Sequence, residues 1–402
     1  MRVLLINHFP LEGSGSGTYT RDVAHYLVVK GHEVCVIFPE NEKPDELAGV
    51  HYRLVYFNGC SESASALPFN FPCFTTHPRS TTTFSDLSKH ELDEYCVAFD
   101  KAITEAIDSF KPDIIHVQHI WLLSYLASKH QVPFVITAHG TDLMGYEKWP
   151  QFREFADTAA DSCDRVIAIS WDNLHIAMDT FPQIKSKTVL LPNGYNDEIF
   201  YPVKVSRSAL LAEYGVPYEE EKIVLFAGKL THFKGADVLL HATRKYESLY
   251  PGAFTTVIAG AGKEDTMLRQ LAEELGLTST YFIGHRSQAE LRELYSASDI
   301  FVIPSRYEAF GLVALEAMAC GLPVVATNNG GLSDFVTDKV GSVTDCDPDA
   351  LFKAILKEID NNEKAPERSS LVATYALDHY SMVHYVEELE QIYLDVLANR
   401  NL

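Results

Sequence analysis

Long hydrophobic runs and paired cysteines are both missing from this sequence. No stretch approaches the roughly 18 apolar residues that a membrane-spanning helix needs. The seven cysteines contain no C-x-x-C pair and are odd in number, which favours reduced, mostly buried thiols over disulfides or a zinc site. The segment 1–7 is too short for the core of a signal peptide, so we expect a cytoplasmic protein.

Positive charge is also scarce. The chain has 33 lysines and arginines against 55 aspartates and glutamates, a formal net charge of −22. A field of that sign repels phosphate-rich surfaces, so we expect no binding to nucleic acid and at most weak association with anionic membranes. The predicted helix 88–110 is itself acidic and offers no basic amphipathic face to a bilayer. A few local lysines, arginines and helix ends must therefore hold any phosphate that the protein binds.

Familiar nucleotide and metal motifs are absent as well. The segment 7–20 places three glycines between the first predicted strand and the first predicted helix, but it does not fit G-x-G-x-x-G, and no G-K-[ST] follows. We expect Gly15, Ser16 and Gly17 to lie in a flexible loop that contacts substrate; the alternative is a plain turn. The motif H-V-Q-H at 116–119 lacks the helical spacing and the acidic partner of a familiar metal site, so we expect no metal there.

Short apolar strands alternate with helices along the chain, the pattern of largely parallel α/β sheets. The pattern starts afresh after a turn-rich stretch at 192–202, and 402 residues exceed one ordinary core. We therefore expect two doubly wound domains, 1–195 and 196–378, followed by a C-terminal segment 379–402. The predicted strands are 3–7, 34–38, 114–117, 134–138, 166–169, 189–191, 223–227, 255–259, 281–283, 300–303 and 324–327.

Two segments depart from this alternation. Residues 58–86 contain three prolines, a Ser/Thr-rich run and scattered aromatic residues, which indicates a long irregular excursion. It is either a functional loop or a tolerated surface insertion. The last predicted helix, 382–397, repeats apolar residues at helical spacing, so one face must pack on another part of the chain. We expect it to pack back on the N-terminal domain.

The most informative segment is E-A-F-G-L-V-A-L-E at 308–316. An apolar strand precedes it and a good helix sequence follows Gly311, so this glycine lies where strand turns into helix. The first N–H groups of a helix have no internal partner and carry the positive end of the dipole. Glu308 and Glu316 can reach a ligand on that helix end, and carboxylates accept hydrogen bonds from vicinal hydroxyls. A sugar nucleotide has the matching shape, because its diphosphate lies between two hydroxyl-bearing rings.

Two lysines follow another predicted strand, in the segment 226–235. Lys229 and Lys234 lie beside Gly228 and Gly235, where a strand is joined to a helix. Paired cations suit a diphosphate leaving group, on which charge builds as a glycosidic bond breaks. An equally supported interpretation is that both lysines are solvated residues on the protein surface.

His139 and Asp142 follow the predicted strand 134–138. Ligands of open α/β sheets bind at the carboxyl ends of the strands, which makes both residues candidates. The alternative for His139 is a capping or buried, hydrogen-bonded imidazole.

Together these segments resemble the retaining glycosyltransferases of family 4, which have the GT-B fold. The resemblance covers nearly the whole chain and is strongest in P-S-x-x-E-x-F-G-L-x-x-x-E-A-M-A-x-G-x-P-V-V-A-T at 304–327, which Gly330 and Gly331 follow. Agreement at many spaced positions in both halves is more specific than any single motif. It implies two Rossmann-like, doubly wound α/β domains that face a cleft between them.

The resemblance implies a nucleotide diphosphate sugar donor, held mostly by the second domain, and an acceptor held mostly by the first. Glu316 would hold the ribose hydroxyls, Glu308 the donor sugar, and Lys229 and Lys234 match the basic pair of the family. His139 matches the histidine near the reacting carbon. The donor side would also include Gly228, His285, Arg286, Gly15, Ser16, Gly17 and the backbone of Phe310, Gly311 and Leu312, and the acceptor side Thr141 and Asp142.

The implied chemistry is transfer of a hexosyl or N-acetylhexosaminyl group with retention at the anomeric carbon. No metal or other cofactor is implied, because the helix end and the lysines do the work of a divalent cation. A front-face pathway and a covalent intermediate on a carboxylate both stay open. We expect a UDP-sugar, with GDP and ADP as alternatives, and a soluble small-molecule or glycan acceptor. A non-catalytic sugar-nucleotide binding protein and a GT-B epimerase are the alternative functions.

Overall fold

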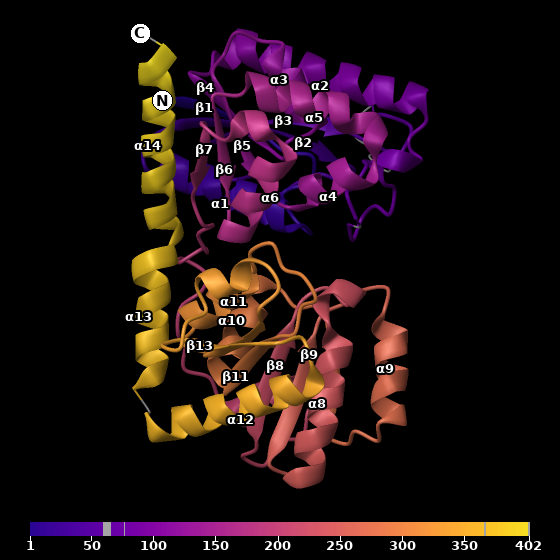
Figure 1. The fold of residues 1–402 in the computed structure, drawn as a ribbon, viewed down its shortest axis with the longest axis vertical. Coiled ribbons are helices and arrows are strands. Elements are labelled where there is room, and N and C mark those ends of the chain that lie inside the picture. Colours follow the sequence, from indigo (N-terminus) through magenta and orange to yellow (C-terminus); the bar gives the residue numbers. More distant parts are fainter. Residues whose placement is uncertain (59–65, 76, 366, 401–402) are drawn as a thin grey trace. The chain divides into compact units, whose positions relative to one another are not determined.

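The computed structural model describes residues 1–58, 66–75, 77–365 and 367–400, and the chain divides into two compact units (Figure 1). Unit 1 comprises residues 1–193 together with the chain from Tyr385 onward, and unit 2 comprises Gly194–His384. Each unit is built on one parallel sheet with helices on both faces. The predicted fold class, two doubly wound α/β domains, is confirmed.

Among the described residues, the sheet of unit 1 has seven parallel strands in the order β3-β2-β1-β4-β5-β6-β7. Strands are added outward from β1 in both directions, so the ends of β1 and β4 form the switch point where doubly wound sheets bind ligands. The strands are β1 Arg2–Ile6, β2 Glu33–Glu40, β3 Val50–Tyr56, β4 Ile114–Gln118, β5 Phe134–Ala138, β6 Arg165–Ala168 and β7 Thr188–Leu190.

Helices cover both faces of this sheet. In β1, Leu4 and Ile6 join one core cluster with Phe99 of α2 and Leu123 of α3, whereas the alternate residue Leu5 is fully buried on the other face. The helices are α1 Gly15–Val29, α2 Lys89–Phe110, α3 Leu122–Ser128, α4 Thr141–Lys148, α5 Arg153–Ser162 and α6 Trp171–Thr180, with 3₁₀ turns at Phe84–Asp86, Pro150–Phe152 and Pro182–Ile184.

Unit 2 repeats the plan with the order β10-β9-β8-β11-β12-β13, six parallel strands within the described residues. The strands are β8 Lys222–Ala227, β9 Phe254–Ala259, β10 Thr280–Gly284, β11 Ile300–Ile303, β12 Val324–Thr327 and β13 Gly341–Thr344. The helices are α7 Arg207–Glu213, α8 Ala236–Leu249, α9 Asp265–Glu274, α10 Gln288–Ala297, α11 Leu312–Ala319, α12 Pro348–Lys364 and α13 Arg368–Tyr380, with 3₁₀ turns at His232–Lys234 and Gly331–Asp334. The loops after the neighbouring strands β8 and β11 therefore emerge side by side.

Every strand predicted from the sequence forms, with ends shifted by two residues at most. The prediction missed β3 and β13. Residues of β3 alternate between exposed and half-buried along most of its length, as in an edge strand, and β13 is a four-residue segment, G-S-V-T, without an apolar run. Both strands lie at sheet edges, where burial selects apolar residues least.

The predicted glycine loop is shorter than expected, because α1 begins at Gly15 and not after the third glycine. Ser14 caps the helix by accepting a hydrogen bond from the Gly17 N–H at 3.0 Å. Gly15, Ser16 and Gly17 therefore form the first turn of α1, and the prediction of a flexible loop at these residues is wrong.

The excursion predicted at 58–86 is built into unit 1 where it is described. Phe71, Phe74 and Phe84 are buried in the main core cluster, and a short antiparallel bridge joins His77 to Ser80. Residues 59–65 and 76 lie outside the described residues. The six described cysteines are free thiols, four of them buried, and Cys60 lies outside the described residues.

The last helix, α14 (Met382–Arg400), belongs to unit 1 from Tyr385 onward. Two of its tyrosine hydroxyls form buried hydrogen bonds to the body of the unit: Tyr385 to the Tyr19 hydroxyl at 2.5 Å and Tyr393 to His116 Nδ1 at 2.6 Å. Farther along, Arg400 contacts both carboxylate oxygens of Asp164, at 2.8 and 2.9 Å. The end of the chain thus supplies polar partners to residues near its beginning.

We expect Tyr393→Phe to destabilise unit 1, because the substitution leaves His116 Nδ1 buried without its partner. An unpaired buried polar group costs about 1–3 kcal/mol, which corresponds to a lower Tm by roughly 2–4 °C per kcal/mol for a unit of this size. Differential scanning calorimetry measures the shift. Tyr250→Phe, at a hydroxyl on a 46% exposed residue, is the control and should leave Tm unchanged. Equal Tm values for the two variants would contradict the role given to Tyr393.

Candidate active site

Three helices that follow candidate residues begin at a glycine. Gly140, Gly235 and Gly311 are the N-cap residues of α4, α8 and α11, with φ of 90°, 66° and 97°, and a glycine has no side chain with which to cap its helix. The first turn of α11 contains no acidic residue either. Its first N–H groups and the positive end of its dipole therefore remain available to an anion.

Gly311 is the residue that its position requires. A Cβ at this position would lie 2.5 Å from Leu332 Cδ2, and the positive φ would strain any side chain as well. The preceding Phe310 is buried and packs on Phe335, with ring centroids 5.1 Å apart. The start of α11, including Leu312, is thus held in place by apolar packing on both sides.

Glu308 lies on the loop between β11 and α11, and its backbone is fixed at both ends. Its N–H donates to Asn329 O at 3.0 Å, and its carbonyl accepts from the Gly331 N–H at 2.9 Å. The carboxylate forms an ion pair with the Lys234 ammonium and lies 3.4 Å from Ser305 Oγ. The structure therefore brings together two of the predicted catalytic residues, which lie 74 positions apart in the sequence.

Lys234 ends a 3₁₀ turn, and the chain then enters α8 through Gly235. This glycine is pressed against the loop after β11, because a Cβ at position 235 would lie 1.9 Å from Pro304 O. Lys229, the other predicted lysine, is exposed and follows Gly228 at the end of β8. Both lysines thus lie at the carboxyl end of β8, beside the loop that carries Glu308.

Glu316 lies in the second turn of α11 and is only 9% exposed. Its Oε2 atom is 3.4 Å from the hydroxyl of Tyr295, a fully buried side chain of α10. Glu316 is therefore a nearly buried acceptor of hydrogen bonds at the side of α11.

His285 and Arg286 follow β10 at the other side of β9. His285 is exposed, whereas the Arg286 guanidinium is used within unit 2: it contacts Glu290 at 3.1 Å, donates to Ile283 O and lies 4.6 Å from the centroid of the Tyr214 ring. The side chain of Arg286 is therefore committed to local structure.

In unit 1, His139 follows β5 and its Nε2 lies 2.8 Å from Gln118 Oε1, at the end of the neighbouring strand β4. With the amide oxygen facing it, the imidazole donates from Nε2 and keeps a lone pair on Nδ1. Burial lowers the pKa of His139 to about 3, so the ring is neutral at physiological pH. A neutral imidazole can hydrogen-bond a sugar hydroxyl without attracting anions.

Asp142 is fully buried, and its carboxylate accepts the N–H of Ile120 at 2.8 Å and that of His139 at 3.2 Å. Burial raises the pKa of Asp142 to about 6, although backbone donors lower it. The side chain ties the loop after β4 to the loop after β5, so it positions His139. Thr141, its half-buried neighbour, begins α4.

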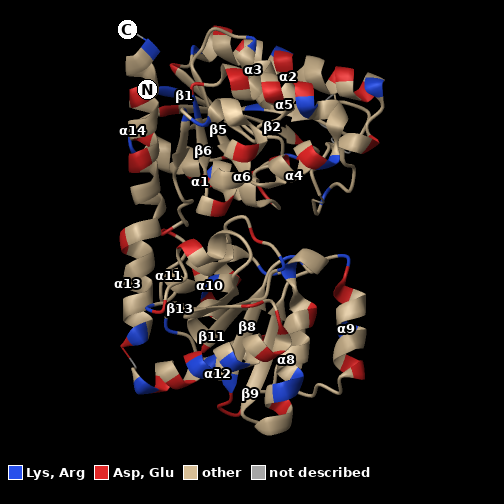
Figure 2. Cartoon of the chain, viewed as in Figure 1, with Lys and Arg blue, Asp and Glu red and all other residues tan. Residues whose placement is uncertain are grey.

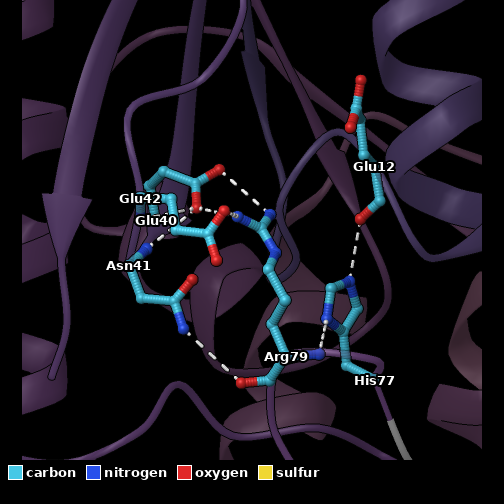
Figure 3. Close-up of polar contacts among 6 residues, drawn as sticks. All are labelled: Glu12, Glu40, Asn41, Glu42, His77 and Arg79. Carbon is cyan, nitrogen blue, oxygen red and sulfur yellow. Dashed lines mark hydrogen bonds and ion pairs between the residues drawn. The ribbon is translucent and has the colours of Figure 1, made fainter. Parts of the chain in front are cut away.

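Residues of the excursion contact the segment just before α1 (Figure 3). His77 Nε2 donates to Glu12 O at 2.8 Å, just before the glycines, and a Cβ on Gly13 would lie 2.8 Å from the same Nε2 atom. Arg79 holds this hairpin in place through Glu40, with contacts of 2.6 and 3.2 Å. The Ser16 hydroxyl is buried, and no hydrogen-bond partner lies among the described residues.

Several polar residues at this edge of the sheet were not predicted to be part of a sugar-binding site; His119 was considered only as a metal ligand. His8 and His119 lie buried beside His139, with the rings of His8 and His119 5.7 Å apart and those of His119 and His139 4.8 Å apart. Gln118 was also missed. Their positions at the ends of β1 and β4, at the switch point of the sheet, are the signal that could have found them.

His116 is not near a metal site in the described residues, where no group of three His, Cys, Asp or Glu side chains is placed to hold an ion. Both nitrogens of His116 are used, by Tyr393 and by Thr137 Oγ1 at 2.7 Å.

Comparison with known proteins agrees with this geometry. Residues 13–199 match the family described as Glycosyltransferase Family 4, and residues 212–371 match Glycosyl transferases group 1. A D-inositol 3-phosphate glycosyltransferase of Mycolicibacterium smegmatis is 30% identical over 338 residues, covering 79% of this chain and 75% of that protein. The chain belongs to the family 4 glycosyltransferases. It is therefore a glycosyltransferase, an enzyme that transfers sugars.

Solved structures confirm the GT-B fold of this glycosyltransferase. Sucrose-phosphate synthase from Thermosynechococcus elongatus superposes with a TM-score of 0.76 at 22% identity, covering 99% of this chain and 100% of that one. Anabaena HepE in complex with UDP and glucose gives a TM-score of 0.72 at 21% identity, covering 96% and 98% of the two chains. At these identities the likeness concerns the fold alone.

The surface of the glycosyltransferase reflects its acidic composition. Acidic residues are spread over the helices of both units, and α2 shows more of them than basic ones (Figure 2). Among the helices that the structure describes, none combines the length and the apolar character that crossing a membrane requires.

We expect unit 1 to lose stability as the pH falls below about 6.5. Burial lowers the pKa of His8, His116 and His139 to about 3, whereas histidines of the unfolded chain titrate near 6.5. In this range the unfolded chain binds protons that the folded unit does not, so the free energy of unfolding decreases as the pH is lowered. Burial also lowers the pKa of His119 well below its usual value. Asp142, with its pKa raised from 3.8 to about 6, acts in the opposite direction, but it is one group against these four histidines.

Calorimetry between pH 7.5 and 5.5 checks this expectation. His8→Phe removes one of the buried imidazoles and should make the Tm of unit 1 less dependent on pH. His51→Gln, at an exposed position on β3, is the control and should leave the pH dependence unchanged. A Tm that rises on acidification would show that these rings are protonated in the folded unit.

Proposed function

We propose that this glycosyltransferase moves a hexosyl or N-acetylhexosaminyl group from a nucleotide diphosphate sugar, most simply a UDP-sugar, to a hydroxyl of a soluble acceptor, with retention at the anomeric carbon. The observation that carries the proposal is the Lys234–Glu308 ion pair beside the open N-terminus of α11. A cation, a helix dipole and a carboxylate then meet at one point. A diphosphate next to a sugar ring needs these three groups together.

Unit 2 would hold the donor. The ribose hydroxyls would be bound by Glu316, whose nearly buried carboxylate lies one helical turn from the start of α11. The diphosphate would accept hydrogen bonds from the N–H groups at the start of α11 and from the ammonium groups of Lys229 and Lys234. The base would lie against the backbone at 285–286, after β10.

Charge neutralisation is the chemical work of this site. As the glycosidic bond breaks, negative charge builds on the leaving diphosphate, and fixed cations stabilise it more in the transition state than in the ground state. An ammonium has three donors, so Lys234 can bind a phosphate oxygen and still contact Glu308. We propose on this basis that transfer does not require a divalent cation.

Glu308 would act at the sugar and His139 near its reacting carbon. The backbone hydrogen bonds of Glu308 restrict the orientation of its carboxylate, and the contact of His139 Nε2 with Gln118 restricts that of the imidazole. Groups that act on a reacting sugar need such fixed orientations. Retention follows either from a front-face attack, in which the leaving phosphate takes the acceptor proton, or from a covalent intermediate on a carboxylate. We propose that Asp142 serves this site through His139.

Unit 1 would hold the acceptor at the ends of β1, β4 and β5. Two relatives are named for hydroxyl-rich molecules: the D-inositol 3-phosphate glycosyltransferase of Mycolicibacterium smegmatis and the glycogen synthase of Mycobacterium tuberculosis. These names support a soluble polyol, sugar or sugar phosphate as the acceptor class. They also fit a cytoplasmic enzyme.

We expect Glu308→Ala, Lys234→Ala and His139→Ala each to lower the transfer rate by roughly 10²–10³-fold, the typical cost of removing one group that stabilises transition-state charge. Circular dichroism and Tm should show normal folding in all three. Lys245→Ala, at an exposed ion pair on α8, is the matched control and should keep the wild-type rate. Unchanged turnover in all three site variants would rule out the proposed catalytic role.

Donor identity can be measured by thermal shift with UDP-, GDP- and ADP-sugars. We expect one of them, the UDP-sugar first, to raise the free energy of unfolding of unit 2 by about 2.7 kcal/mol at a hundredfold excess over Kd, and so to raise its Tm. Glu316→Gln should abolish this shift, and EDTA should leave it and the transfer rate unchanged. Release of free nucleotide with an altered sugar, and without a glycosylated acceptor, would identify an epimerase.

A further inference from the structure

One arginine joins the two loops that carry the reacting groups of unit 2. Arg306 lies two residues before Glu308, on the loop after β11, and its guanidinium reaches the loop after β8. Its Nη1 donates to His232 O at 2.8 Å, and its backbone N–H donates to Phe233 O, also at 2.8 Å. Arg306 thus binds the two carbonyls that immediately precede Lys234.

The same guanidinium is anchored by a carboxylate. Its Nη1 and Nη2 donate to the two oxygens of Asp237, in the first turn of α8, at 2.8 and 2.6 Å. Burial opposes ionisation of Asp237, but the hydrogen bonds and charge of Arg306 lower its pKa below the usual value. This two-point contact between Arg306 and Asp237, called the fork below, fixes the plane of the guanidinium. A lysine ammonium could not form it.

The contacts leave little freedom to the turn that carries Lys234. The carbonyls of His232 and Phe233 are held by Arg306, the next residue is Lys234, and Gly235 is pressed against Pro304 O. A shift of the guanidinium would therefore move the ammonium of Lys234 relative to Glu308. The guanidinium itself binds His232 O, and the backbone N–H of Arg306 binds Phe233 O.

We propose that Arg306 and Asp237 are positioning residues for the transfer reaction: they set the distance between the ammonium of Lys234 and the carboxylate of Glu308. The inference rests on the function proposed above for those two groups. Neither positioning residue needs to touch the donor. In the proposed function most contacts of the nucleotide lie elsewhere in unit 2, at Glu316, Lys229, the start of α11 and the segment after β10, so loss of the fork should lower kcat much more than it weakens nucleotide binding.

The experiment compares two forks of the same unit. Arg306→Lys and Asp237→Asn each keep the size and polarity of the side chain but remove the planar, doubly charged contact. The matched control is Arg207→Lys, because Arg207 forms a similar fork with Asp299, at 3.0 and 3.2 Å, away from the loops after β8 and β11. For each variant we would measure Tm, the Kd of UDP by calorimetry, and kcat and KM for the donor sugar.

We expect Arg306→Lys and Asp237→Asn to lower kcat by about 100-fold, the cost of misplacing a reacting group by about 1 Å, with much smaller changes in the Kd of UDP and the donor KM. Arg207→Lys should lower Tm by about as much as Arg306→Lys does, but it should keep the wild-type kcat. The reversed pair, Arg306→Asp with Asp237→Arg, should recover part of the kcat that each reversed single variant loses.

Each other result overturns the inference. Wild-type kcat in Arg306→Lys and Asp237→Asn would show that the fork does not position Lys234, and an equal loss in Arg207→Lys would assign the effect to stability. Loss of folding in both fork variants would likewise make the pair structural. A wild-type enzyme that binds no nucleotide and transfers no sugar would instead refute the proposed function, and that outcome is visible before any variant is made.

Discussion

The ion pair between Lys234 and Glu308 depends on one constraint, the adjacency of β8 and β11 in a parallel sheet. Because parallel strands end at the same edge, residues 74 positions apart in the chain are delivered to one place, and the backbone approach of Gly235 to Pro304 closes the gap between their loops. The open start of α11 lies in the same loop connection. The proximity of the cation, the carboxylate and the helix dipole thus follows from the strand order of the sheet.

The two units solve different electrostatic problems. Unit 2 places Lys229 and Lys234 at the carboxyl end of β8 in an otherwise acidic protein, where the proposed function needs cations for a diphosphate. Unit 1 instead presents neutral imidazoles, because burial keeps His8 and His139 unprotonated, and its one buried carboxylate near His139 is satisfied by backbone N–H groups. Neutral groups of this kind fit the hydroxyl-bearing acceptor proposed above.

Much of this could be predicted from the sequence, for physical reasons that also explain the failures. Buried strands such as β5 and β11 consist mostly of apolar residues, so the sequence predicted both strands with their observed bounds. Gly311 lies at a strand-to-helix turn where a side chain would collide with Leu332, and the turn was predicted from the glycine. The edge strand β3 was missed because half-exposed residues dilute its pattern. Partners such as Gln118 for His139, or Arg306 for Asp237, depend on which strands become neighbours, and local periodicity holds no information about that.

The assignment of α14 to unit 1 also constrains how the protein is made. Unit 2 is continuous in sequence, from Gly194 to His384, so a ribosome releases everything it needs in one piece. Unit 1 is interrupted: Tyr19 and His116 are synthesised before unit 2, but the tyrosines that bond to them, Tyr385 and Tyr393, are synthesised after it. A chain that has emerged as far as residue 384 therefore contains all of unit 2, while unit 1 still lacks two of its buried hydrogen bonds.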